Sequence, residues 1–125
     1  MNIPVRKTTK EDFFSKLFEA VSTAKTIHLY QKDKNGFTHL AMENLYEKLS
    51  DISDTFYESY SGLYGTTLFT FSSKLGDTNA LTYVQSVYNY IDTNRNLFVE
   101  SFLQNEIDEM QALLAHTMYK LKYVL

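Results

Sequence analysis

The sequence predicts an all-α fold in which four long amphipathic helices make up a single domain over residues 1–125. Apolar residues recur every three or four positions in four stretches, which is the repeat of a helix with one buried face. The four glycines and the single proline can all be placed outside these stretches. A hydrophobic share of 44% in 125 residues is enough for one sizeable core.

The first helix is predicted to begin after Thr8 or Thr9, because Thr8 and Glu11 have the spacing of a capping box. It runs to about Tyr30, and a tight polar turn is expected at residues 33–36. Its expected core face consists of Leu17, Ala20, Val21, Ala24 and Ile27.

The second helix is predicted from about Phe37 to Ser61. Its expected core stripe consists of Ala41, Leu45, Leu49, Ile52, Phe56 and Leu63. Residues 62–77 contain three glycines, and the alternation at residues 66–71 resembles a strand. A lone strand has no partner, so we expect an aromatic connector over the bundle, extended or with a short helix.

The third helix is predicted from about Thr78 to Ile91, with Asp77 as its cap and a short turn at residues 92–96. Its core side would be Leu81, Val84, Val87, Tyr88 and Ile91. The fourth helix would span Leu97 to Tyr123. Its inward side chains would be Phe98, Phe102, Met110, Leu114, Thr117, Leu121 and Val124.

The lengths of the connections predict how the helices are arranged. Short first and third connections make each helix pair antiparallel, while the long second connection can cross the length of the bundle. This up-and-down order with one long crossover is that of a ferritin-like four-helix bundle.

Composition excludes several classes of function. The net charge of −3 argues against wholesale nucleic-acid binding, and Arg6, Lys7 and Lys10 are expected to form a solvated arm, with phosphate contact as the minor alternative. The absence of cysteine excludes disulfides and thiolate ligands, so any metal site needs imidazole and oxygen. Without a signal-peptide core or a membrane span, a cytoplasmic protein is expected.

Four metal-capable side chains share one face of the second predicted helix. At about 100° per residue, Glu43, Asp54 and Glu58 lie roughly 40°, 60° and 100° around from His39, nearly opposite the core stripe. His39 and Glu58 would be about 28 Å apart, too far for one coordination sphere. Two antiparallel copies of this helix would solve the problem, because each chain would supply half of the ligands. His28 would join them at the end of the first helix. Such a mixed donor set suits ferrous iron, and zinc would also bind.

In this pattern the sequence resembles the miniferritin family, the DNA-binding proteins from starved cells. The likeness rests on His39 followed by Glu43, on Asp54 followed by Glu58, and on His28 upstream. It implies that His28, His39 and Glu43 of one subunit meet Asp54 and Glu58 of its two-fold mate. It further implies oxidation of ferrous iron by peroxide or oxygen and storage of ferric mineral inside a homo-oligomer, from a dimer up to a dodecameric shell. Nucleic acid would be protected indirectly.

The sequence also differs from that family and leaves alternatives open. Glu43 stands where Asp is usual, Leu29 where Trp is common and Ser59 where Arg is usual, and a lysine-rich tail is missing. One alternative is a solvated polar helix face on a non-catalytic ferritin-like structural or partner-binding module. His116 has no carboxylate three or four residues earlier, so we expect a structural role for it.

Overall fold

The computed structural model describes residues 6–31, 36–74 and 79–124, and in these ranges it contains four α-helices and no strand. The helices are α1 (Lys10–Tyr30), α2 (Phe37–Tyr64), α3 (Ala80–Asn94) and α4 (Ser101–Tyr123). A short 3-10 helix, η1 (Arg95–Leu97), lies between α3 and α4. The predicted all-α class is confirmed.

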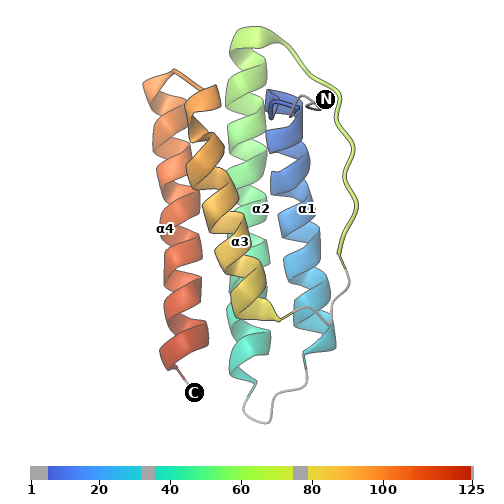
Figure 1. Cartoon of the computed structure of the whole chain (residues 1–125), viewed down its shortest axis with the longest axis vertical. Coiled ribbons are helices and arrows are strands. Elements are labelled where there is room, and N and C mark those ends of the chain that lie inside the picture. Colours follow the sequence, from blue (N-terminus) through green and yellow to red (C-terminus); the bar gives the residue numbers. More distant parts are fainter. Residues whose placement is uncertain (1–5, 32–35, 75–78, 125) are drawn as a thin grey trace, which may run out of the picture.

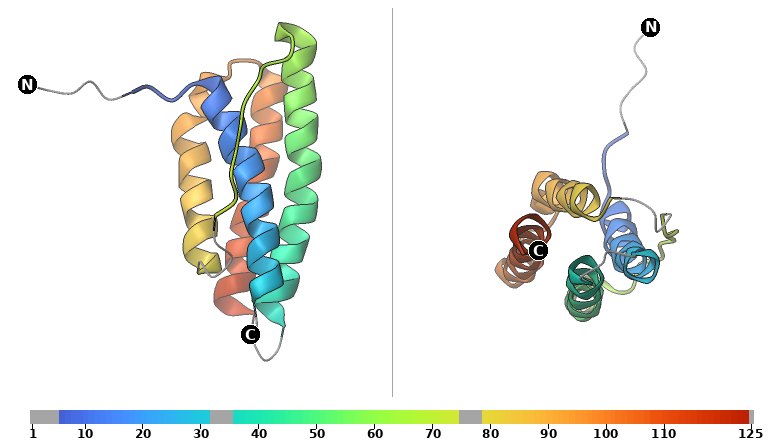
Figure 2. Two further views of the ribbon diagram at one scale, coloured as in Figure 1. Left: turned by 90° about the vertical axis from the view of Figure 1, so that its right-hand side faces the viewer. Right: turned by 90° about the horizontal axis from the view of Figure 1, so that it is seen from below.

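The helices pack as a four-helix bundle with one long crossover (Figure 1). In that view α1 runs downward, α2 returns upward, and residues 65–74 descend along the outside of the bundle before α3 rises and α4 descends. The view along the bundle shows α2 and α3 at opposite corners of a square (Figure 2). The main contacts join α1 to α2, α2 to α4 and α3 to α4. The predicted ferritin-like arrangement is therefore confirmed.

A capping box begins α1, one residue later than the sequence predicts. The Asp12 N–H donates to Thr9 Oγ1 at 3.1 Å, and the Thr9 N–H donates to the Asp12 carboxylate at 2.9 Å. Glu11, the predicted partner, instead accepts a hydrogen bond from the Thr67 hydroxyl at 2.9 Å. The Thr9 N–H, together with Arg6 at 2.8 Å, lowers the pKa of Asp12. The negative charge of Asp12 also suits the positive end of the α1 dipole.

Two predicted boundaries around the crossover are wrong. Helix α2 continues past Ser61 to Tyr64, so Gly62 lies inside a helix. It stops where Gly65 adopts φ 83°, a conformation that favours glycine. Helix α3 is capped by Asn79, whose side chain accepts from the Thr82 N–H at 2.9 Å. The predicted cap, Asp77, lies outside the described residues, as does the predicted turn at 33–35.

The predicted turn at residues 92–96 is also wrong. Helix α3 extends through Asn94 and passes directly into η1, and α4 starts at Ser101 instead of Leu97. Arg95 ties this junction to α4, because its Nε donates to Gln104 Oε1 at 2.9 Å and its Nη2 contacts Asp108 at 2.6 Å. These polar contacts fix the corner and leave Phe98 free to turn inward.

Aromatic rings fill the middle of the bundle. Phe13, Phe56 and Phe98 form a triangle with ring centroids 4.9–5.7 Å apart, and each of the three is at most 3% exposed. Most predicted core positions are confirmed, but Leu81 is only half-buried and lies outside the core cluster, and three others are exposed. Leu63, Phe102 and Val124 are exposed, since they lie in or beside terminal helical turns where fewer helices pack alongside.

The crossover is anchored by an aromatic side chain, as predicted, and residues 65–74 contain no helix. The Phe69 ring stacks on Phe18 at 5.2 Å and meets Tyr57 at 5.6 Å. The Tyr57 hydroxyl donates to the Thr67 carbonyl at 3.0 Å. These contacts place the connector against α1 and α2 near one end of the bundle.

Candidate metal centre

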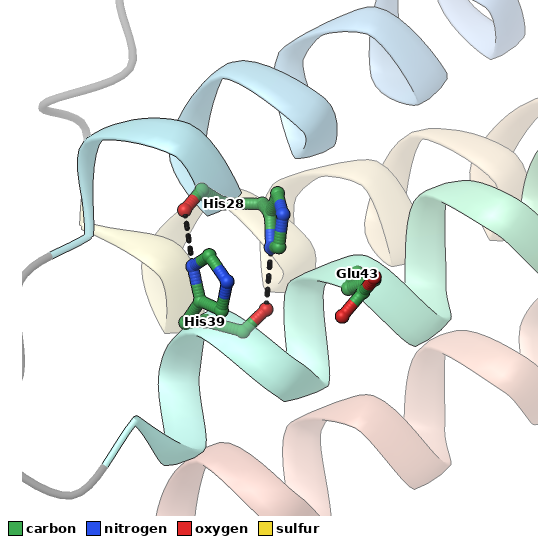
Figure 3. A group of neighbouring side chains, drawn as sticks. All are labelled: His28, His39 and Glu43. Carbon is green, nitrogen blue, oxygen red and sulfur yellow. Dashed lines mark hydrogen bonds between the residues drawn. The ribbon is translucent and has the colours of Figure 1, made fainter.

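Three of the five predicted ligands come together at one end of the α1–α2 hairpin (Figure 3). His28 lies in the last turn of α1, His39 in the first turn of α2 and Glu43 one turn later. Antiparallel packing places the end of α1 beside the start of α2, which explains the proximity. Metal-capable atoms of the three side chains all lie within 4.8 Å of one another.

Reciprocal hydrogen bonds hold the two histidines. His28 Nδ1 donates to the His39 carbonyl at 2.7 Å, and His39 Nδ1 donates to the His28 carbonyl at 2.8 Å. A carbonyl can only accept, so in both rings Nδ1 carries the proton. In the neutral rings Nε2 is then the nitrogen with a lone pair for a metal.

The same bonds tie the end of α1 to the start of α2. The His28 carbonyl lies in the last turn of α1, where carbonyl groups run out of helical N–H partners. The His39 ring supplies a donor and caps the helix. The two rings stack with centroids 3.7 Å apart, and the Tyr46 ring stands edge-on to His28 at 5.4 Å. His28 is only 7% exposed, whereas His39 and Glu43 are half-buried.

The three donors form a partial coordination sphere. Two ligand atoms about 2.1 Å from one ion can be at most about 4.2 Å apart, so donor atoms spread over as much as 4.8 Å have to move closer together to bind one ion. The half-buried Glu43 carboxylate has rotamer freedom for this movement, while the Nδ1 bonds hold the rings. Such orienting bonds are typical of metal-binding histidines. Three protein donors leave further coordination positions for other ligands.

Asp54 and Glu58 are not brought to this cluster. They lie eleven and fifteen positions beyond Glu43 on α2, which corresponds to about 16 Å and 22 Å along the helix axis. Both are exposed. Among the described residues of one chain, the site therefore consists of His28, His39 and Glu43.

Two other titratable side chains lie outside this cluster, His116 on α4 and Glu19 on α1. His116 is exposed on α4 and, in the described part of the chain, belongs to no group of metal-capable side chains. Glu19 was not singled out from the sequence, yet its side chain is buried, with only 8% of its surface exposed. Its carboxylate accepts a hydrogen bond from the Tyr83 hydroxyl at 2.8 Å. Lys16 contacts the same carboxylate at 3.2 Å. Burial, together with Glu19, raises the pKa of Tyr83. The spacing of Lys16 and Glu19, three apart on one helix, was the available sequence clue.

None of the described helices combines the length and apolarity that a bilayer span requires. Comparison with curated proteins and with solved structures gives no match to this chain. Residues 35–121 match a family of unknown function, DUF5856, and this range contains His39, Glu43, Asp54 and Glu58. Since the match covers more than half of the sequence, the chain belongs to the family of unknown function DUF5856.

Proposed function

We propose that the chain is a miniferritin-like iron-binding protein that oxidises ferrous iron at sites shared by two copies of itself. The observation that carries this proposal is the pair of stacked histidines with both Nδ1 atoms bound to backbone carbonyls and Glu43 beside them. This arrangement leaves the Nε2 lone pair of each ring for a metal and places a carboxylate close to the two rings. Histidine rings held only for packing have no need of a neighbouring carboxylate donor.

Mixed nitrogen and oxygen ligation suits ferrous iron as the substrate. Zinc would bind the same set and would act as an inert substitute. In the proposed reaction two ferrous ions each lose one electron, and hydrogen peroxide accepts both electrons with two protons to give two water molecules. Asp54 and Glu58 of a second copy would supply the remaining protein oxygens. Storage of the ferric product in a closed oligomer, in the cytoplasm, completes the proposal.

Ferrous oxidation kinetics test the proposal directly. The parent should oxidise ferrous iron faster than buffer, and His39→Ala and Asp54→Ala should both fall toward the buffer rate, because each removes a donor. Glu109→Gln is the control, since it neutralises an exposed carboxylate on α4. Circular dichroism should show all variants folded. A parent no faster than buffer would overturn the enzymatic proposal.

A second candidate, a non-catalytic partner-binding bundle, is favoured by a different observation. An apolar hollow lies between the start of α2 and the end of α4, and its lining includes Leu40 and Tyr119, which are 58% and 56% exposed. Exposed apolar groups of this size are typical of interaction sites. This candidate predicts normal folding without ferrous oxidation, and loss of partner binding in Leu40→Ser with no effect of His39→Ala.

A further inference from the structure

The outward face of α2 has an excess of negative charge. Five carboxylates lie within about 80° of one another around the helix. They are Glu43, Glu47, Asp51, Asp54 and Glu58. All except the half-buried Glu43 are exposed, and in the described part of the chain none of them forms an ion pair. A solvated helix face would by itself account for these acidic residues. A metal-linked pairing is therefore argued from the positions of the proposed metal ligands along the same face of α2.

The two pairs of proposed ligands define a single pairing register. His39 lies nine positions before residue 48, and Glu58 lies nine positions after residue 49. Glu43 and Asp54 lie five positions before and after the same two residues. If two α2 helices pair antiparallel with both ligand pairs matched, the two-fold axis must pass beside the bond between residues 48 and 49.

This axis falls on acidic residues. Glu47 and Asp51 lie about 2 Å and 4 Å from the midpoint along α2, so the two copies bring four carboxylates close to the axis. The surface there is a hollow of about 560 Å³ between α1 and α2. Lys25 is the one cation of its described lining, beside Glu47 and Asp51. The paired face would thus hold ten carboxylates, and like charges this close oppose association.

We infer that pairing of two chains is linked to metal: the metal-free chain resists dimerisation, and divalent cations at the shared sites drive it. The inference rests on the proposed function. Each bound cation brings two positive charges to the acidic face and joins donors of both chains. A ligand that binds the paired state more tightly than the separate chains stabilises the paired state, and the stabilisation grows with the logarithm of ligand concentration once the sites fill. Because a dimer has two sites, the apparent dimerisation constant should approach a square dependence on metal concentration once that concentration exceeds the dissociation constant of the shared sites.

The linkage gives the proposed site a means of control. Chains would remain apart when the metal is scarce and would complete both the site and the dimer when it is abundant. Apart from the acidic residues, His28 also points to a metal at this site. Its side chain is only 7% exposed, and its Nδ1 proton is donated to the His39 carbonyl.

Sedimentation velocity with the whole chain tests the inference, using zinc as a redox-inert probe. With chelator the parent should sediment as a monomer at micromolar concentration, and zinc should shift it to dimers or larger assemblies. Glu47→Gln, alone and with Asp51→Asn, should associate without zinc, because it removes charge at the axis and retains all five ligands. Glu109→Gln, the same chemical change on α4, should behave like the parent.

Isothermal titration calorimetry with zinc distinguishes failure of the metal-linked dimerisation from failure of the proposed function. Zinc binding with no change in mass would overturn the metal linkage but leave metal binding intact. A parent that dimerises equally well with chelator would also overturn the linkage. Absence of zinc and ferrous binding would overturn both the linkage and the proposed function.

Discussion

Mixing two inactive variants provides a sharp test of a site shared between chains. His39→Ala lacks a nitrogen donor, and Asp54→Ala lacks a carboxylate that we assign to the facing subunit. In a mixed dimer one site carries both defects. The other site takes His39 from the Asp54→Ala chain and Asp54 from the His39→Ala chain, so it is intact. The separation of about 22 Å between these residues along α2 prevents a single chain from using both at one ion.

The expected recovery follows from random pairing. About half of the dimers are mixed and each has one intact site of two, so the mixture should oxidise ferrous iron at about a quarter of the parent rate. The chains would be co-refolded, their heterodimers counted by native mass spectrometry, and the rate followed by absorbance of the ferric product. His39→Ala mixed with His28→Ala is the matched control and should recover nothing, since both defects fall in the same half-site. Mixed dimers without recovery, beside an active parent, would refute shared ligation.

Three further predictions concern stability. Phe56→Ala should lower the free energy of unfolding by about 3–5 kcal/mol in denaturant titration, because the fully buried ring contacts Phe13 and Phe98. Thr9→Ala should cost about 0.5–2 kcal/mol through loss of the cap, and an equal stability of parent and variant would show that the capping box contributes nothing. Burial raises the pKa of Glu106 above 4.5, so the native state holds its proton longer than the unfolded state and the parent loses stability as pH rises through that range. Glu106→Gln should lack this loss in thermal melts, while its neutral amide keeps an acceptor for the Ser59 hydroxyl.

The sequence predicted the helices and most of the core because both depend on local periodicity. It placed the first cap one residue early, since Thr8 with Glu11 and Thr9 with Asp12 have the same spacing. A contact distant in sequence distinguishes them: Glu11 bonds to Thr67, fifty-six positions away. Local patterns contain no information about that contact.

Boundaries judged from helix-breaking residues were less accurate. Gly62 was placed outside a helix, yet a glycine in a helix interior costs only about 1 kcal/mol, which packing of a long helix can offset. Residues 92–94 have turn-forming side chains but continue α3. Asn94 does so while its side chain donates to the Tyr90 carbonyl at 2.8 Å. Contacts with other helices support both extensions, because the Tyr64 hydroxyl donates to Glu100 and Gln111 Nε2 donates to Asp92 at 3.1 Å.

The proximity of His28 and His39 was predictable from a short hairpin, but their mutual hydrogen bonds were not. Those bonds join each ring to the backbone carbonyl of the other residue, so they depend on the exact approach of two helix ends. Burial of Glu19 was missed for a similar reason. Its partner Tyr83 lies on α3, beyond the crossover, and the spacing of Lys16 and Glu19 on α1 gives no information about that partner.

The composition of the interior also explains why metal chemistry would lie at the edge of this bundle. Its centre is filled by phenylalanine rings, which leave no group of inward carboxylates and histidines among the described residues. Only two of the buried polar side chains there are metal donors, Glu19 and His28. Glu19 is already held by Lys16 and Tyr83. His28 is held by His39 through Nδ1, which leaves its Nε2 lone pair for a ligand, and it lies where α1 ends beside α2. Among the described residues no further donor joins His28, His39 and Glu43, so under the proposed pairing ligation and association are expected to occur together.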